Sequence, residues 1–499
     1  MRMNMKSIKS WLEDDSKGYR LLQGVFLVIY FFINFLDGLA KGGRWDLYQH
    51  IATADRFLNG QGYFYSTQLA SSPYFPGVGF LSVLVSLVAA PVRDYVLLFI
   101  ASLAGTVFVY LMLKIATKYA KSSFVVLLFF MVLLFRPFGY YRSYMNEFKA
   151  DSIVMVIGIC LMFLIDRMED GSVRRNFPRW LAVMALTFVM GIFKQHALYI
   201  DVGIGLYLLL ARKLSVREKF YFLSAMFVGG LLDLAVIFSI PGITINTMQD
   251  LKDMPYYTIR EIILMFIDFG VSNFYACLFI FCSMVLVAAK ALKISSLLKK
   301  YLFVSCLFML MQLAGAIKTG GNNGNTESGL VTFMPFAALA ADYLVVHYAS
   351  IKTAVLKVIA VTVCVLPFFG NALRLINARG SYLENKKVVS YLSQFQGEEF
   401  LYYSNQYMNV FRAGIVPGLD VYSIPWNTER YYQTLENSLK SREYEYLLLN
   451  TADLEAWEKY QRKYLNRTVN LLAPLSENYD EIIDPAMPES IQGQLFRRK

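Results

Sequence analysis

Charged residues are scarce in this 499-residue chain, and their scarcity excludes an ordinary soluble domain. Asp, Glu, Lys and Arg make up 17% of the residues, against about 25% in typical soluble domains. Cysteine is also scarce: the five cysteines fall in apolar segments without metal-ligand spacing, so they are interpreted as small core residues. The chain also lacks internal repeats and low-complexity tracts.

Long apolar runs dominate what is present. Hydrophobic residues make up 56% of the chain, and the mean hydropathy is +0.43. The run Leu21–Leu39 is about as long as a helix needs to cross a bilayer, and similar runs recur as far as Phe369. The first run is too long for a secretory signal and no small-residue cleavage pattern follows it, so it is interpreted as a retained anchor. The sequence predicts a mainly α, polytopic membrane helix bundle of roughly 11 to 13 transmembrane helices.

The net charge of +11 does not indicate nucleic-acid binding, because of where the charge lies. Residues 1–370 hold 33 Lys and Arg against 21 Asp and Glu, whereas residues 371–499 hold 15 against 16. The excess sits in short loops between apolar runs, as the positive-inside rule describes. We therefore expect a membrane lipid environment and no nucleic-acid partner.

The same rule predicts the orientation of the chain. With the N-terminus in the cytoplasm, the cytoplasmic loops carry 22 Lys and Arg. The opposite loops carry 10 and span residues 41–76, 136–149, 194–196, 241–260 and 318–328. We expect a multi-pass protein of the cell (inner or cytoplasmic) membrane. The loops at 41–76 and the C-terminal region would then be extracytoplasmic.

Two apolar regions are irregular. The span Gly77–Ile115 is predicted to be two helices broken at residues 90–94, and its first helix either forms a full hairpin or is only partly embedded. Segments Trp180–Phe193 and Ala197–Ala211 are short for full spans and meet at Lys194. Short paired helices are typical of broken, site-forming membrane elements.

Composition changes after Phe369, which predicts two domains: a transmembrane domain over 1–370 and a small α/β domain over 371–499. The second domain contains strand-like runs FLYYS, DVYSI and EYEYLLLN and the helix-like stretch ADLEAWEKYQRKYL.

The stretch WDLYQHIATADRF, residues 45–57, is half polar. As a helix it aligns Leu47, Ile51, Ala54 and Leu58 in an apolar stripe suited to the membrane interface. Asp46 and His50 are neighbours four residues apart on an adjacent face. The helix is either an interfacial element with a solvated polar side, or it presents Asp46 to a substrate that is partly lipid.

Other polar loops fall on the same predicted side of the membrane, and each leaves two interpretations open. Glu147 and Asp151 either favour a helix N-terminus or form a second acidic cluster with Arg142. Lys194 is either a snorkelling lysine or a phosphate clamp. The loop KTGGNNGNTESG lacks the Walker spacing of a nucleotide-binding P-loop. It either forms a simple turn or binds a sugar. Asp233 and Asp342, inside apolar runs, are either functional carboxylates or helix contacts.

Several of these motifs together resemble the GT-C superfamily of integral-membrane glycosyltransferases, nearest the bacterial branch akin to protein mannosyltransferases and the lipid A aminoarabinose transferase. The first external loop carries D-x-Y-x(3)-A as Asp46, Tyr48 and Ala52, then GQGYFY and Ser72-Pro73-Tyr74-Phe75-Pro76. NEFKADS resembles the second acidic motif of that family, KQHAL its basic-polar helix break, and GGNNGN a later external loop. The chain departs from the family in its single Asp46 and in YFP where YPP is usual.

The resemblance implies a sugar carried on a polyprenyl phosphate and transferred, with inversion, to a lipid, glycan or protein acceptor outside the cytoplasm. Asp46 is the candidate general base. The candidate substrate-binding residues are His50, Tyr74, Arg142, Glu147, Asp151, Lys194, Gln195, Asn322, Asn325 and Glu327. A divalent ion, Mg²⁺ or Mn²⁺, shared by Asp46, Glu147 and Asp151 is an open alternative.

Two other classes compete with this interpretation. A lipid-linked sugar transporter or flippase would explain the broken helices, but it predicts polar residues along a path through the membrane rather than at one face. A polysaccharide polymerase or ligase usually relies on a large arginine-rich external loop, whereas the loop at 241–260 is short and holds only Lys252 and Arg260 as cations.

Overall fold

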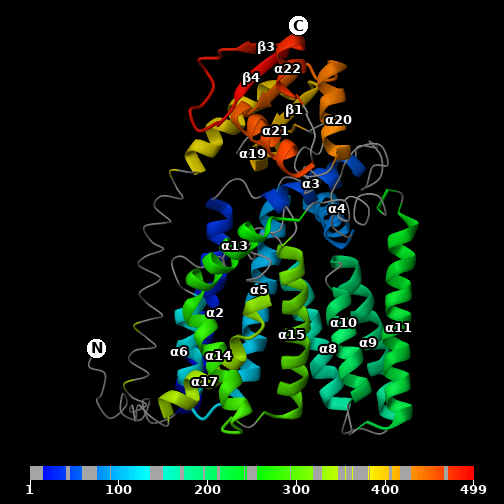
Figure 1. Cartoon of the computed structure of the whole chain (residues 1–499), viewed down its shortest axis with the longest axis vertical. Coiled ribbons are helices and arrows are strands. Elements are labelled where there is room, and N and C mark those ends of the chain that lie inside the picture. Colours follow the sequence, from blue (N-terminus) through cyan, green and yellow to red (C-terminus); the bar gives the residue numbers. More distant parts are fainter. Residues whose placement is uncertain are drawn as a thin grey trace.

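The computed structural model describes residues 15–40, 45–58, 76–89, 92–134, 150–168, 173–194, 197–210, 214–240, 242–243, 256–292, 294–317, 329–346, 355, 362, 380, 382–403, 407–415, 429–465 and 470–499. Most of these residues are helical. A helix bundle and a small α/β domain stacked at one end of it make up the molecule (Figure 1).

The bundle consists of helices that run mostly along the long axis of the molecule (Figure 1). In chain order they are α2 (Asp15–Ala40), α3 (Trp45–Leu58), α4 (Gly77–Ala89), α5 (Arg93–Thr117), α6 (Ser123–Leu134), α8 (Asp151–Met168), α9 (Val173–Phe193), α10 (Ala197–Leu210), α11 (Val216–Ser239), α13 (Ile259–Ser272), α14 (Phe274–Ala288), α15 (Ser296–Ala316) and α17 (Met334–Leu344).

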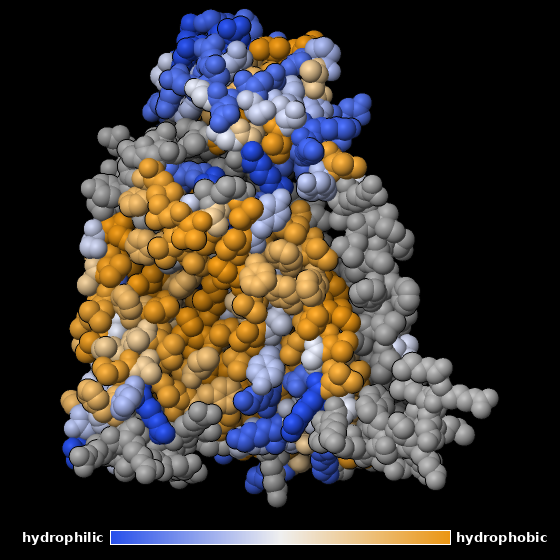
Figure 2. All heavy atoms as spheres, turned by 180° about the vertical axis from the view of Figure 1, so that it is seen from behind, coloured by the Kyte–Doolittle hydropathy of each residue, from blue (hydrophilic) through white to orange (hydrophobic). Residues whose placement is uncertain are grey.

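Helix length and composition agree with an integral membrane protein. Within the described residues, four helices are long and apolar enough to cross a bilayer, or five if the bent pair α13–α14 counts as one span, and five further apolar helices are shorter. On the face seen in Figure 2, a broad band of apolar side chains covers the middle of the bundle, with polar residues beyond it at both ends. Exposed Leu84, Leu209 and Phe281 belong to this apolar surface, which a bilayer would cover.

The break predicted within residues 77–115 is present, between α4 and α5. α4 has 13 residues, which gives a length of about 20 Å, less than the roughly 30 Å of a hydrocarbon core. It lies beside α3 at the end of the bundle nearest the α/β domain, which we call the domain end (Figure 1). This placement favours the partly embedded alternative.

The pair around Lys194 differs in part from the prediction. α10 has the predicted length, but α9 begins at Val173 and has 21 residues, so it is not short. Its additional turns include Pro178 and basic residues that no apolar pattern marks as helical. The two helices still meet at Lys194.

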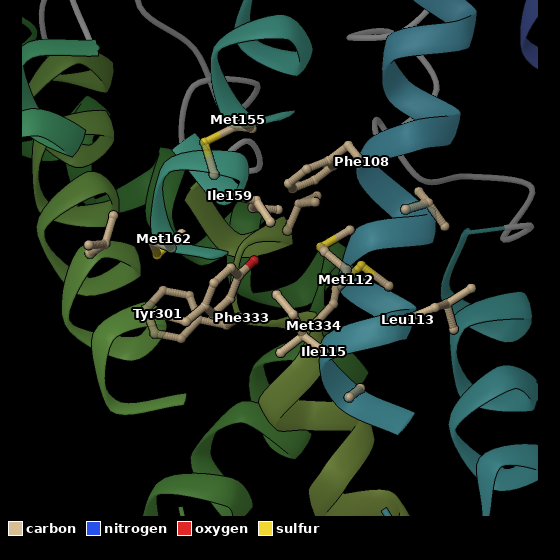
Figure 3. Packing of buried hydrophobic residues seen from close by; sticks show 14 of the residues in the cluster. Phe108, Met112, Leu113, Ile115, Met155, Ile159, Met162, Tyr301, Phe333 and Met334 are labelled. Atoms are coloured by element: carbon tan, nitrogen blue, oxygen red, sulfur yellow. The ribbon is translucent and has the colours of Figure 1, made fainter. Parts of the chain in front are cut away.

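One large apolar core joins most of the bundle helices. Phe108 and Met112 of α5, Met155 of α8 and Tyr301 of α15 lie around the same space, together with Met334 of α17 (Figure 3). All of these side chains are buried. The apolar runs of the sequence therefore face one another as well as the membrane.

The C-terminal domain holds a four-stranded mixed sheet. Its strands are β1 (Phe400–Tyr403), β2 (Tyr446–Leu449), β3 (Tyr479–Ile482) and β4 (Gln494–Arg498), in the order β1-β2-β4-β3. β1 and β2 are parallel, and the other two pairings are antiparallel. The helices of this domain are residues 382–392, α19 (Tyr407–Arg412), α20 (Glu429–Lys440), α21 (Thr451–Leu465) and α22 (Leu472–Asn478).

The domain is packed firmly on the bundle. A second apolar core contains Leu47 of α3, Val78 of α4 and Leu97 of α5 together with core residues of the sheet, such as Leu401 and Leu447. The fold predicted from the sequence, a polytopic helix bundle with a small C-terminal α/β domain, is therefore confirmed. FLYY, YLLL and the helix over 452–465 are confirmed as well, whereas DVYSI lies outside the described residues.

Candidate functional site

Helix α3 closes the domain end of the bundle. Its predicted apolar stripe is present, and Leu47, Ile51 and Ala54 are buried. Protein rather than lipid covers this stripe, because α4 and the C-terminal domain pack on it; only Leu58, at its end, is exposed. Asp46 lies in the first turn of α3, and its side chain falls outside what the structure describes.

The polar side of α3 is not solvated at His50 and Asp55, which are both buried. Arg93, at the start of α5, donates hydrogen bonds through both terminal nitrogens to the two Asp55 carboxylate oxygens, with Nη2 to Oδ2 at 2.7 Å. Burial raises the pKa of the Asp55 carboxyl, and Arg93 lowers it by less. The interpretation of α3 as an interfacial helix with a solvated polar side is therefore wrong at these two residues.

A buried ion pair joins two of the predicted site residues. Lys194 Nζ donates a hydrogen bond to Asp151 Oδ2 at 2.6 Å, and the two residues are only 8% and 5% exposed. Asp151 is the first residue of α8 and Lys194 directly follows the last residue of α9. The charges therefore also complement the dipoles of those helix ends. A lysine buried in protein and paired with a carboxylate is not a snorkelling lysine.

Lys194 keeps hydrogen-bonding capacity beyond this pair. An ammonium group has three N–H donors, and among the described residues Nζ donates to Asp151 alone. Within the described residues, the pair thus leaves two of the three N–H donors of Lys194 without an acceptor.

The start of α4, the start of α8, the end of α9 and the start of α10 meet around this pair. A Cβ atom added to Gly77, the first residue of α4, would lie 2.9 Å from the Cα of Phe193, so α4 and α9 touch at their backbones. Ala150, directly before α8, belongs to the same apolar core as Leu47 of α3. The structure thus brings Asp151 and Lys194 to the end of the bundle that carries α3 and its Asp46.

The remaining predicted site residues lie outside the described residues: Tyr74, Arg142, Glu147, Gln195, Asn322, Asn325 and Glu327. Within the described part of the chain, no three His, Cys, Asp or Glu side chains converge as metal ligands. The Asp151 carboxylate is engaged by Lys194, a cation that would repel a metal ion there. A metal shared by Asp46, Glu147 and Asp151 stays a prediction.

Two other carboxylates have structural partners. Asp342 accepts hydrogen bonds from the backbone N–H groups of Lys121 and Ser122, at 2.7 and 2.8 Å, just before α6 begins. It is therefore one of the helix contacts that the sequence left as an alternative. Asp94 was not predicted as a contact. Its carboxylate accepts from Arg412 of the C-terminal domain at 2.6 Å, and the same guanidinium lies over Tyr95.

No protein-family model and no curated protein matches the sequence. The solved structures that share the fold include two of ArnT from Cupriavidus metallidurans. The form bound to undecaprenyl phosphate has a TM-score of 0.56 and 12% identity, covering 97% of this chain and 98% of that one. The apo form has a TM-score of 0.57 and 11% identity, covering 95% and 96%. The resemblance to GT-C glycosyltransferases predicted from the sequence is thereby confirmed as a likeness in fold to ArnT over nearly the whole chain.

Proposed function

We propose that this protein is a GT-C glycosyltransferase that moves a sugar from a polyprenyl-phosphate donor to an acceptor hydroxyl at the domain end of the bundle. The observation that carries the proposal is the buried Lys194–Asp151 pair at the same end as Asp46. The fold supports the lipid class of the donor, because a similar structure is bound to undecaprenyl phosphate.

Lys194 would bind the donor phosphate. A charge-assisted hydrogen bond is worth about 1.5–3 kcal/mol, and Lys194 has donors beyond the one given to Asp151. Asp151 would act as a positioning residue that holds the ammonium group in one place, because the pair is buried and cannot rearrange freely. Arg142 would add a second cation for the charge that develops on the leaving phosphate.

Asp46 would act as the general base. The acceptor oxygen attacks the anomeric carbon while the bond from that carbon to the phosphate oxygen breaks, and the electron pair leaves with the polyprenyl phosphate. The acceptor proton passes to the Asp46 carboxylate. One such displacement inverts the anomeric centre. His50, Tyr74, Glu147 and the loop with Asn322, Asn325 and Glu327 would orient the sugar or the acceptor.

The domain end would face away from the cytoplasm. The excess of Lys and Arg in the opposite loops supports this orientation, and the C-terminal domain would then be extracytoplasmic. A reporter fused at Lys499 should be active only outside the cytoplasm. Activity only in the cytoplasm would overturn the orientation, and the placement of Asp46 with it.

The reaction is tested by release of polyprenyl phosphate from a panel of lipid-linked sugars by the purified full-length protein. Asp46→Asn keeps the shape of the side chain but cannot accept the proton, so kcat should fall about 10²–10⁴-fold with donor KM nearly unchanged. Glu147→Gln is the comparison. If Asp46→Asn keeps wild-type turnover while Glu147→Gln loses it, the base lies in the second loop. If no lipid-linked sugar is consumed, the proposal fails.

The phosphate contact needs a variant that separates binding from folding. Lys194→Arg keeps the cation and should retain part of the activity. The double variant Lys194→Met/Asp151→Leu removes both buried charges, so it should fold but show a donor KM raised about tenfold or more. An unchanged donor KM in the folded double variant would reduce the pair to a structural contact.

A further inference from the structure

Two carboxylates that the proposed chemistry does not use lie inside the bundle, close to Lys194. Asp201 of α10 and Asp233 of α11 interact electrostatically with each other. Asp233 rests on α9: a Cβ atom added to Gly191 would lie 2.3 Å from its Oδ2. Gly191 precedes Lys194 by three residues, so this contact is about one helix turn from the Lys194–Asp151 pair.

Neither carboxylate has a cationic partner within the described part of the chain. Asp233 is 8% exposed, and its Oδ1 accepts no hydrogen bond there; the Oδ1 of Asp201 accepts none either. Thr187 of α9 is 2% exposed and lies within hydrogen-bonding reach of Asp201, and its hydroxyl has no other hydrogen-bond partner among the described residues. Oxygen atoms of three different helices therefore converge without a positive charge among them.

Close packing of α9 on α11 holds these groups in place. Gly229 lies one turn before Asp233 on α11, and a Cβ atom there would approach the Met184 carbonyl oxygen to 2.5 Å and the Thr187 Cβ to 3.1 Å. Glycines at both positions let the two backbones approach each other, as is common between membrane helices. The oxygen atoms therefore belong to a rigid part of the bundle.

Other charges on the neighbouring helices do not neutralise this pair. Lys194 and Asp151 are bonded to each other, and α4 has no charged residue. The other described charges on α9, α11 and α15 lie in the first two turns of those helices, away from Lys194: Arg179, Arg217, Glu218, Lys219, Lys299 and Lys300.

Two negative charges close together inside the bundle, with Asp233 buried and Asp201 partly exposed, are costly, because each loses hydration and each repels the other. A positive charge between them would offset both costs. We propose that Asp201, Asp233 and Thr187 form a binding site for one monovalent cation, a proton or a sodium ion. The ligands are all oxygen atoms, which suits a hard cation, and three side chains are too few for Ca²⁺, which takes 6–8 oxygen ligands. This site goes beyond the proposed transferase function.

Thermal unfolding of the full-length protein in lipid nanodiscs tests the site. It is followed from pH 5 to 9 in sodium chloride or choline chloride at equal ionic strength. A sodium site predicts that Tm rises by roughly 2 °C or more with sodium at constant pH, and a proton site predicts a similar rise as pH falls in choline. Either dependence should disappear in Asp201→Asn/Asp233→Asn. The exposed carboxylate variant Asp268→Asn is the control and should keep the wild-type dependence.

Binding of radioactive sodium or proton uptake measured by titration gives a second readout that does not require activity. About one cation should be bound per chain, and Thr187→Val should weaken binding about threefold to tenfold. The proposal is overturned if the wild type and the double variant depend equally on pH and on sodium. Because neither measurement uses sugar transfer, failure here leaves the proposed transferase untouched, and the reverse also holds.

Discussion

Carboxylates at the domain end are paired with basic side chains, whereas those between α9, α10 and α11 are not, among the described residues. At the domain end, Asp55, Asp94 and Asp151 each have a Lys or Arg partner. In the interior, Asp201 lies beside Thr187 and Asp233, and neither carboxylate has a Lys or Arg partner among the described residues. Helix ends bring basic side chains and backbone dipoles together, whereas a residue in mid-helix is surrounded by apolar neighbours. Carboxylates retained without a partner in a membrane bundle are candidates for function rather than stability.

The most severe test of this comparison is Lys194→Met, which leaves Asp151 charged and buried. Removing one partner of a buried pair costs about 3–5 kcal/mol, so the free energy of unfolding should fall by that amount. Lys194→Met/Asp151→Leu should recover most of the loss, since no charge is then stranded. Equal stability of the single variant and the wild type would mean that the pair contributes nothing.

Arg412→Met tests the pair between the domain and the bundle. Its side chain is partly exposed, so the expected loss is smaller, about 1.5–3 kcal/mol. Limited proteolysis should release the C-terminal domain faster than in the wild type. Arg462→Met is the matched control, because Arg462 is largely exposed and 3.9 Å from Glu458; its effect should stay below about 0.5 kcal/mol.

Asp342→Asn should cost about 1 kcal/mol. The two backbone N–H groups bond to different Asp342 oxygens, and the amide places an NH2 donor at one of these two positions, so one of the two hydrogen bonds is lost. Hydrogen exchange should accelerate at Lys121 or Ser122 and remain unchanged at the start of α11, which has its own capping box at Ser215.

Asp233→Asn should have the smallest effect and the opposite sign. In choline chloride above pH 8, losing an unpaired buried charge should leave stability unchanged or raise it by up to about 1 kcal/mol. The free energy of unfolding of Asp233→Asn, compared with that of the wild type, tests this prediction. A loss as large as that of Lys194→Met would show that Asp233 has a partner, and the two regions would no longer differ.

Local patterns predicted much of the fold. Apolar runs predicted the bundle helices, and aromatic and leucine-rich runs predicted β1 and β2. β3 and β4 were not predicted, because each is a short segment rich in charged residues whose strand pairing depends on tertiary contacts. The extra turns of α9 were missed because they are basic rather than apolar.

The candidate site was predictable residue by residue but not pair by pair. Lys194 and Asp151 were both singled out, yet they are 43 residues apart, and Arg412 and Asp94 are 318 apart. No helical or strand period records contacts at such separations. Asp201 is different: it is a carboxylate inside an apolar run, the same signal that marked Asp233 and Asp342, and it could have been found in the same way.

Neighbouring residues at the start of α5 connect parts of the molecule that are otherwise separate. Arg93 binds α3 through Asp55, and Asp94 binds the C-terminal domain through Arg412. Successive side chains on a helix point about 100° apart. A rotation of α5 about its axis would therefore move the contact with α3 and the contact with the C-terminal domain together. α3, which carries Asp46, and the C-terminal domain are therefore both attached to the first turn of α5. A fluorophore on the domain would report movement of α3 without any label near the substrate.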